Sequence, residues 1–365
     1  MKNYLLVSLS LILGASCAGW SKVQKSAHAK VDVIAYYAGN GADLDQYQFG
    51  QLDQVIFSFC HLRGNELTID DATDTVTIRK LVALKKQHPR LKVLLSLGGW
   101  GGCAPCSEVF STAQGRTAFV RSVKKLTQDF QTDGIDLDWE YPGIEGYPGH
   151  LFQPADKGHF TALVQELRRE LGEKVEISFA AGGFDAFFEG SVEWDRVIPL
   201  VNRVNIMTYD LVNGYSTVTG HHTPLYSTPD QRLSADYAIK YLERLGVPRH
   251  KMVLGAAFYA RVWEQVPNIN QGLYQSGKFK SFVPYQRFLN TVTEAEGYRF
   301  YRDTLAQAPY AYNAQQQLFA TYDDRESIRQ KTQYVQRERL GGIMFWQLVG
   351  DVRENGLLEA IFQAF

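Results

Sequence analysis

Short apolar runs with β-strand character alternate with helical patterns along most of this chain. Eight such runs cover residues 31–38, 54–60, 92–97, 134–141, 175–181, 203–209, 251–258 and 342–348. The helical patterns cover residues 75–88, 116–130, 156–171, 230–245, 326–340 and 354–362, with a shorter one at 191–201. Strands that alternate with helices predict parallel βαβ units, and eight such units predict an α/β fold of the (β/α)8 TIM-barrel type.

One interval interrupts this rhythm between the seventh run and the next long helical pattern. Residues 260–324 are rich in Gly, Tyr, Gln and Phe, with strand-like pieces at 299–301 and 318–322. The interval is too long for a loop, so we expect a small α+β insertion subdomain there and a barrel built from residues 31–259 and 325–365. A doubly wound sheet is the rival architecture, but the turn Gly39-Asn40-Gly41 lacks the third glycine of a nucleotide-binding loop.

The first 17 residues have the pattern of an export signal. Lys2 supplies a positive charge, residues 5–13 are mostly apolar, and small residues follow. The apolar run is too short for a membrane-spanning helix. Cys17 stands in a context similar to a bacterial lipobox, so lipid attachment at Cys17 and simple cleavage near Ala18 both stay open. Residues 18–30 then form a polar tether, and the expected location is secreted, periplasmic or lipid-anchored at a bacterial outer membrane.

The remaining cysteines fit an exported protein, because disulfides persist outside the cytoplasm. Cys103 and Cys106 are candidates for a tight loop disulfide, and Cys60 lies in an apolar strand as a candidate buried thiol. A thioredoxin-like redox pair is the alternative for Cys103 and Cys106. The segment has too few ligands for zinc. A formal net charge of -1 and the lack of a basic run argue against a nucleic-acid partner.

Four acidic residues fall within eight positions of the fourth apolar run: Asp133, Asp136, Asp138 and Glu140. Residues two apart in a strand share a face, so the last three should line one face while apolar residues line the other. Such carboxylates repel one another and resist desolvation, which suits an enzyme that needs a protonated carboxyl group near neutral pH. A solvated acidic loop and a magnesium or calcium site are the alternatives.

Aromatic and polar residues recur where the predicted strands end, and in a barrel the active site lies at those ends. They include Tyr36, Tyr37, Trp100, Asp138, Glu140, Tyr209, Asp210, Tyr259, Arg261 and Trp346. Together they predict a cleft with aromatic walls and a carboxylate floor. Such a cleft suits a carbohydrate better than a metal-bound phosphate.

Four segments, in this order, resemble the signature positions of the family 18 glycoside hydrolases, the chitinases and their relatives. They are Ser96-Leu97-Gly98-Gly99, Asp133-Gly134-Ile135-Asp136-Leu137-Asp138-Trp139-Glu140, Met207-Thr208-Tyr209-Asp210 and Trp346. The resemblance runs from about residue 31 to residue 365. The interval 260–324 resembles the α+β insertion of the chitinase branch.

This resemblance implies hydrolysis of β-1,4-linked N-acetylglucosamine chains with retention of configuration. Glu140 would be the general acid and base. The nucleophile would be the substrate's own N-acetyl oxygen, which closes to an oxazolinium ion. Asp138 would bond the acetamido N–H and share a proton or hydrogen bond with Asp136, and Tyr209 would donate its hydroxyl to the acetamido carbonyl.

Further substrate contacts are implied at Asp210, Met207, Trp346, Tyr37, Phe59, Gly99, Trp100, Tyr141, Arg261 and Tyr259. The resemblance implies no metal and no cofactor, and a monomer is expected. An endo-β-N-acetylglucosaminidase that acts on N-glycans would use the same acids. A catalytically silent chitin-binding lectin is the third reading, although it predicts loss of the acid that Glu140 supplies. Exo or endo action, processivity and the physiological glycan stay open.

Overall fold

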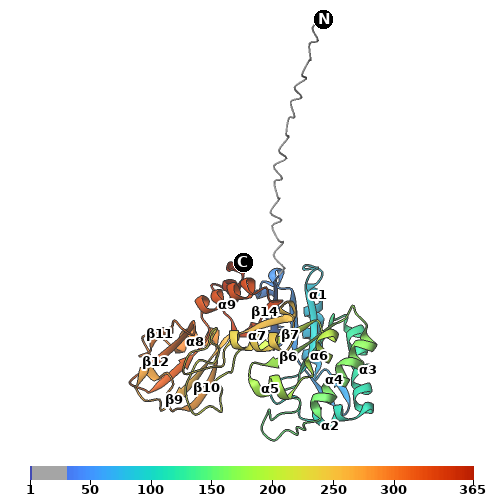
Figure 1. The fold of residues 1–365 in the computed structure, drawn as a ribbon, viewed down its shortest axis with the longest axis horizontal. Helices are drawn as coiled ribbons and strands as arrows, with labels where there is room; N and C mark the ends of the chain where they lie inside the picture. The colour runs from blue at the N-terminus through green and yellow to red at the C-terminus, as the bar shows by residue number, and fades with distance from the viewer. Residues whose placement is uncertain (2–30) are drawn as a thin grey trace.

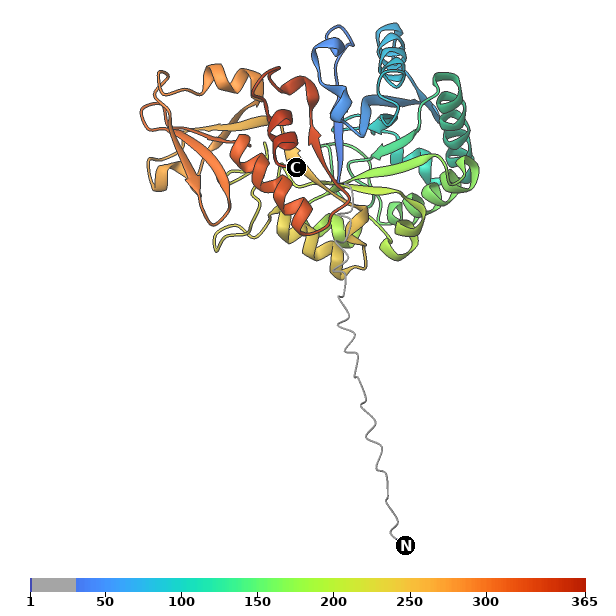
Figure 2. The same cartoon turned by 90° about the horizontal axis from the view of Figure 1, so that it is seen from above.

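The computed structural model describes residue 1 and residues 31–365, and its larger part is a closed barrel of parallel strands (Figures 1 and 2). The eight barrel strands are β1 (Asp32–Tyr37), β2 (Gln54–Arg63), β4 (Lys92–Gly98), β5 (Gly134–Asp138), β6 (Glu176–Gly182), β7 (Arg203–Met207), β8 (Met252–Ala257) and β14 (Gly342–Trp346). Each pairs with its neighbours in the order β1-β14-β8-β7-β6-β5-β4-β2, and β1 pairs with β2 to close the ring. The predicted (β/α)8 barrel is confirmed.

Helices surround the barrel, as the view in Figure 2 shows. The longer ones are α1 (Ala72–Leu84), α3 (Ala113–Phe130), α4 (Asp156–Leu171), α7 (Ala235–Arg244), α9 (Arg325–Arg337) and α10 (Leu357–Gln363). The shorter ones are α2 (Cys106–Ser111), α5 (Asp185–Gly190) and α6 (Trp194–Val197). Short 3-10 turns occur at Leu44–Gln46, Phe49–Gln51, Ile198–Leu200, Arg249–Lys251, Asn270–Gly272 and Leu348–Gly350.

Side-chain caps explain where the helices begin. Asp71 caps α1 by accepting the backbone N–H of Asp74, so the helix starts three residues before the predicted position. Ser234 caps α7 in the same way, which places its start five residues after the predicted one. The predicted helix at 191–201 is divided, because Pro199 cannot donate to a continuing helix. The sequence patterns did not predict β3 (Glu66–Thr68), which forms a hairpin with β2.

The barrel separates two layers of buried side chains. Inward-facing residues such as Ile34, Tyr36 and Met344 form a small cluster inside the ring. Their neighbours in the chain point outward and join the larger core beneath the helices. Tyr37 belongs to that outer core and is 0% exposed, with its hydroxyl accepting the backbone N–H of Gly41 at 2.9 Å. The predicted substrate contact at Tyr37 is therefore wrong.

A second sheet follows β8 and lies beside the barrel, at the left of Figure 1. Its strands are β9 (Tyr259–Glu264), β10 (Lys278–Pro284), β11 (Arg299–Asp303), β12 (Ala308–Asn313) and β13 (Leu318–Thr321), with α8 (Tyr285–Thr291) after β10. The strands are antiparallel in the order β10-β9-β13-β12-β11. This unit of five strands and one helix spans residues 259–321, and β9 begins at Tyr259, one residue before the interval 260–324.

The predicted export signal, tether and lipidation site at Cys17 lie outside the described residues. In the part of the chain that the structure describes, no helix is both long enough and apolar enough to cross a membrane.

Candidate active site

The acidic motif begins at Asp133, just before β5, and continues through the strand to the two residues after it. Asp136 and Asp138 face the barrel interior, whereas Leu137 and Trp139 point into the outer core. The strand ends at Asp138 rather than at residue 141 as predicted, so Glu140 stands beyond the last paired residue, at the barrel mouth. Asp138 is buried and Glu140 is partly exposed.

Asp136 is the centre of a buried hydrogen-bond network. Its two carboxylate oxygens accept hydrogen bonds from the hydroxyls of Tyr36 (3.0 Å), Ser96 (3.0 Å) and Ser178 (2.6 Å), and from the Asn205 amide (3.1 Å). Burial raises the pKa of Asp136, and the four donors oppose that rise by favouring the ionised form. With four donors aimed at it, the carboxylate has its acceptor positions filled.

Asp138 lies between two other acids. Burial raises its pKa well above the ordinary value, and the charges of Glu140 and then Asp136 add to the rise. Its Oδ1 atom is buried and has no hydrogen-bond partner among residues 31–365. The sharing of a proton or hydrogen bond between Asp136 and Asp138 stays a prediction; in this structure Asp136 is engaged by four other donors.

Glu140 has the protonation behaviour of a general acid. Burial raises the pKa of Glu140 to about 7, a hydrogen bond with the Tyr141 hydroxyl opposes the rise, and the charge of Asp210 adds to it. Burial is the largest of these effects. At neutral pH the carboxyl group is therefore poised between its two forms, as a group that donates and then accepts a proton must be.

Asp210, at the barrel mouth, accepts hydrogen bonds from neighbouring side chains. The Tyr259 hydroxyl donates to its Oδ1 at 2.7 Å, and Arg261 donates to both oxygens. His222 is fully buried, and its Nδ1 lies 3.6 Å from Oδ1 of Asp210. Burial alone would raise the pKa of Asp210, but His222 and Arg261 hold it well below its ordinary value. Asp210 is thus a fixed negative charge.

Aromatic rings line the mouth beside these acids. Tyr209 is 8% exposed and points its hydroxyl toward Sδ of Met344 at 3.9 Å. Trp346 is partly exposed and stacks on Phe59, with ring centroids 5.5 Å apart and an 18° angle between planes. The ring of Trp346 also contacts that of Tyr36, with ring centroids 5.9 Å apart. Met207 packs partly buried against the same interior cluster.

The loop after β4 connects the acids to the rim. The backbone N–H of Gly99 donates to the carbonyl of Asp138 at 2.9 Å. Gly99 has φ +78°, and a side-chain carbon there would come within 2.3 Å of the Phe59 ring, so glycine is required. Trp100 follows and is 47% exposed. Its ring contacts that of Tyr141, with ring centroids 6.4 Å apart.

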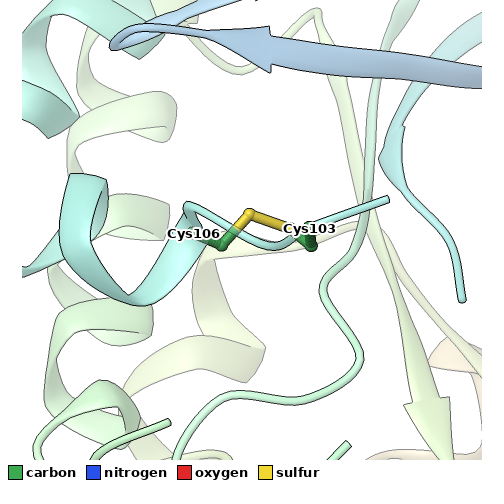
Figure 3. Close-up of a disulfide and its surroundings, with 2 residues drawn as sticks. All are labelled: Cys103 and Cys106. Atoms are coloured by element: carbon green, nitrogen blue, oxygen red, sulfur yellow. A yellow bond between two sulfur atoms is a disulfide. The ribbon is translucent and has the colours of Figure 1, made fainter. Parts of the chain in front are cut away.

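The same loop contains a disulfide between Cys103 and Cys106, just before and at the start of α2 (Figure 3). Cys103 and Glu140 line one small pocket together with His150. Cys60 is a buried free thiol, and burial raises its pKa.

Most of the candidate site residues from the sequence gather at one end of the barrel. They are Asp136, Asp138, Glu140, Tyr209, Asp210, Met207, Trp346, Phe59, Gly99, Trp100, Tyr141, Tyr259 and Arg261. Tyr37 is not among them.

Sequence reasoning assigned no role to several residues of this site. Ser178, Asn205 and His222 belong to it, and Ser96 was noted only as part of a motif. Asn205 is a polar residue at a fully buried position of an apolar strand, a signal that could have identified it. Within residues 31–365 no group of three or more His, Cys, Asp or Glu side chains is arranged to hold a metal ion.

Comparisons with known proteins agree with this geometry. Residues 32–351 match the family model of the glycosyl hydrolases family 18. The chain is 34% identical to Chitinase A1 of Niallia circulans over 75% of its own length and 42% of that protein. It is 29% identical to Chitinase B of Serratia marcescens over 86% of its length and 76% of that protein. The chain thus spans less than two thirds of Chitinase A1.

A solved structure has the same fold over nearly its whole length. It is described as a novel glycoside hydrolase family 18 N-acetylglucosaminidase from Paenibacillus barengoltzii. The TM-score is 0.83 at 33% identity, with 92% of this chain and 100% of that chain covered. The motif, the barrel and the family-model match lead to one conclusion: this chain belongs to the glycosyl hydrolases family 18.

Proposed function

We propose that this protein is a retaining glycoside hydrolase that cleaves β-1,4-linked N-acetylglucosamine chains, with Glu140 as general acid and base. The observation that carries the proposal is Glu140 itself. It stands at the barrel mouth with a pKa of about 7, between buried Asp138 and the fixed charge of Asp210. A carboxyl group in this setting is protonated often enough near neutral pH to protonate a glycosidic oxygen.

The neighbouring side chains supply the rest of the proposed reaction. Asp138 has a buried oxygen without a partner, which is available to accept the acetamido N–H of the sugar. Tyr209 contributes a hydroxyl whose contact in the protein is the weak acceptor Met344, so it is free to donate to the acetamido carbonyl. The acetamido oxygen then attacks the anomeric carbon as the glycosidic bond breaks, and Glu140 protonates the leaving oxygen.

The second half of the reaction uses the same groups in reverse. Glu140, now ionised, removes a proton from water, which attacks the oxazolinium ion on the face that the leaving group vacated. Asp138, held near the charge of Asp136, stabilises the positive charge of that ion. Two inversions at the anomeric carbon give net retention. Holding the nucleophile within the substrate also gives it a high effective concentration.

The relatives support this substrate class. Two are named chitinases and one is described as an N-acetylglucosaminidase. The partly exposed ring of Trp346, stacked on Phe59, offers a flat apolar surface of the kind on which a pyranose packs.

The test is a time course of products from defined chitooligosaccharides and, separately, from N-glycans. Glu140→Gln should lower turnover by about 10²- to 10⁴-fold while leaving binding of the oligosaccharide largely unchanged. Asp133→Asn is the matched control, because Asp133 is bound by Lys85 at the opposite end of β5. Cleavage of N-glycans but not of chitooligosaccharides would show that the substrate is an N-glycan and not the proposed N-acetylglucosamine chain. Substantial turnover by Glu140→Gln would refute the mechanism.

We also propose that the protein is exported and works outside the cytoplasm as a monomer. The pattern of residues 1–17 and the disulfide between Cys103 and Cys106 support this location. Expression of the full chain in a bacterium, followed by fractionation and metabolic labelling with palmitate, separates the possibilities. Label that is lost in Cys17→Ser would establish a lipid anchor. An unprocessed cytoplasmic product would contradict export.

A further inference from the structure

His222 is a fully buried imidazole whose ring makes no hydrogen bond. It lies on the loop after β7, and its backbone is held firmly: its N–H donates to Oγ1 of Thr321 at 3.1 Å, and its carbonyl accepts the N–H of Leu211 at 3.1 Å. Neither ring nitrogen has a hydrogen-bond partner among residues 31–365. Leaving a buried polar group unpaired destabilises a fold, so we expect this ring to gain a partner in another state of the protein.

The ring of His222 approaches one acceptor, the carboxylate of Asp210. Its Nδ1 lies 3.6 Å from Oδ1 of Asp210, whereas an N–H···O hydrogen bond measures about 2.7–3.2 Å. Burial lowers the pKa of His222 from 6.5, and the nearby Asp210 opposes that fall only in part, so the ring is neutral at pH 7. A neutral imidazole has one N–H, and Nδ1 is the nitrogen that faces an acceptor. We therefore assign the proton to Nδ1, where it is aimed at Asp210 from slightly too far away.

The gap exists because Oδ1 of Asp210 is already occupied. The Tyr259 hydroxyl donates to it at 2.7 Å, and Nε of Arg261 donates to the same oxygen. A carboxylate oxygen has two lone pairs, so these two donors fill it. The rings of Tyr259 and His222 are in contact, with centroids 5.1 Å apart. Tyr259 and His222 are thus neighbouring donors for one acceptor position, which Tyr259 holds in this structure.

We propose that His222 is a positioning residue, which donates to Oδ1 of Asp210 when a bound sugar draws the Tyr259 hydroxyl away. This inference rests on the proposed function and on the substrate contacts expected at Asp210 and Tyr259. Arg261 binds both oxygens of Asp210 and keeps the carboxylate in place while the donors exchange. Asp210 therefore has the same number of donors before and after the exchange, and its negative charge near Glu140 is kept through the reaction.

The first test follows the Nδ1 proton of His222 by NMR in protein labelled with 15N-histidine, where the signal is assigned by its loss in His222→Asn. Tyr259→Phe lacks the competing hydroxyl, so the proton should move downfield without any sugar. The same shift should appear when an N-acetylglucosamine trisaccharide binds to Glu140→Gln, which leaves it uncleaved. His221 is the internal control, because its Nε2 already pairs with Asp303 at 3.1 Å and its signal should stay in place.

The second test compares three replacements of His222. The amide nitrogen of Asn is as many bonds from the backbone as Nδ1, whereas that of Gln reaches the position of Nε2. His222→Asn should therefore keep most of kcat/KM for chitooligosaccharides. His222→Leu and His222→Gln should lower it by about 10- to 150-fold, the factor that corresponds to one hydrogen bond to a charged group. Since His222→Leu removes no hydrogen bond of the unliganded protein, its midpoint in a urea titration should not fall.

The inference is overturned if the Nδ1 proton stays in place in Tyr259→Phe, or if His222→Leu keeps the kcat/KM of the unmodified protein. It is also overturned if His222→Asn, His222→Gln and His222→Leu lose activity and stability to the same extent, because that result indicates a purely structural role. A failure of the proposed function is distinct: the unmodified protein would then release no product from chitooligosaccharides, and the inference would fall with it.

Discussion

The protonation of Glu140 should set the alkaline limit of the proposed reaction. Burial raises the pKa of Glu140 from the ordinary 4.5 to about 7. A general acid acts only while protonated, so activity is present below this pKa and lost above it. At pH 6 about 90% of the groups carry a proton, against about 3% if the pKa were 4.5. Above pH 7, kcat/KM should fall about tenfold per pH unit.

The perturbation that tests this reasoning is Asp210→Asn. It removes a negative charge that raises the pKa of Glu140, so the alkaline midpoint of kcat/KM should move to lower pH. Burial is the larger cause, and we therefore expect a shift of at most about one pH unit. The rate itself should also fall, since Asp210 is a proposed sugar contact, but the midpoint is independent of that loss.

The assay is initial-rate hydrolysis of a chitooligosaccharide at low concentration from pH 4 to 9, because kcat/KM reports the free enzyme. Asp133→Asn removes a charge from the same motif at the far end of β5, where Lys85 and the backbone N–H of Val93 bind it. Its alkaline midpoint should equal that of the unmodified protein. A midpoint near 4.5 in the unmodified protein, or no response to Asp210→Asn, would refute the reasoning.

Three further outcomes follow from the structure. Activity should survive exhaustive treatment with EDTA, and loss of activity on chelation would revive the cation-site alternative. Lys331→Met should lower the free energy of unfolding by about 3–5 kcal/mol, because it leaves the fully buried Asp323 without its cation. Its control, Lys280→Met, breaks a partly exposed pair with Glu264 and should cost at most about 1 kcal/mol in the same urea titration. Tyr37→Phe should leave KM unchanged, whereas a raised KM would restore Tyr37 as a substrate contact.

The alternation of side chains between the two faces of a strand limits what the sequence can predict at the barrel mouth. The eight strands were recognisable because each is a short apolar run between turn or helix signals. Tyr36 and Tyr37 were both assigned to the cleft, although neighbours in a strand face opposite sides. The structure turns Tyr36 inward to Asp136 and Tyr37 outward into the core. The sequence alone shows that Tyr36 and Tyr37 face opposite sides of the strand. It does not show which of the two faces the barrel interior, because that requires one residue whose side is already known.

The end of β5 could not be predicted from its own sequence. The alternation of acidic and apolar residues continues to Glu140, and Pro142 gave the only stop signal. The partner strand determines the end instead: β4 finishes at Gly98, which pairs with Asp138 and has φ +104°. Beyond that point β5 has no neighbour on this side, so Glu140 leaves the sheet and reaches the mouth.

The donors around Asp136 also depend on contacts far apart in sequence. Tyr36, Ser178 and Asn205 come from three strands and converge only when the barrel closes. The family resemblance implies that Asp136 shares a proton or hydrogen bond with Asp138. The structure adds that four donors fill the acceptor positions of Asp136, which the motif cannot reveal because these donors lie outside it.

The four buried or partly buried acids of the site differ in how their surroundings affect their protonation. Asp210, next to His222 and Arg261, has a pKa held well below its ordinary value, whereas burial raises the pKa of Asp136 against the opposing effect of its four donors. Between them, Asp138 and Glu140 have pKa values raised by burial, and the nearby negative charges raise them further. The pKa of Glu140, raised to about 7, allows this group to carry a proton near neutral pH. When the sugar's acetamido N–H binds Asp138, it favours the ionised form there and leaves the proton on Glu140, where the glycosidic oxygen needs it.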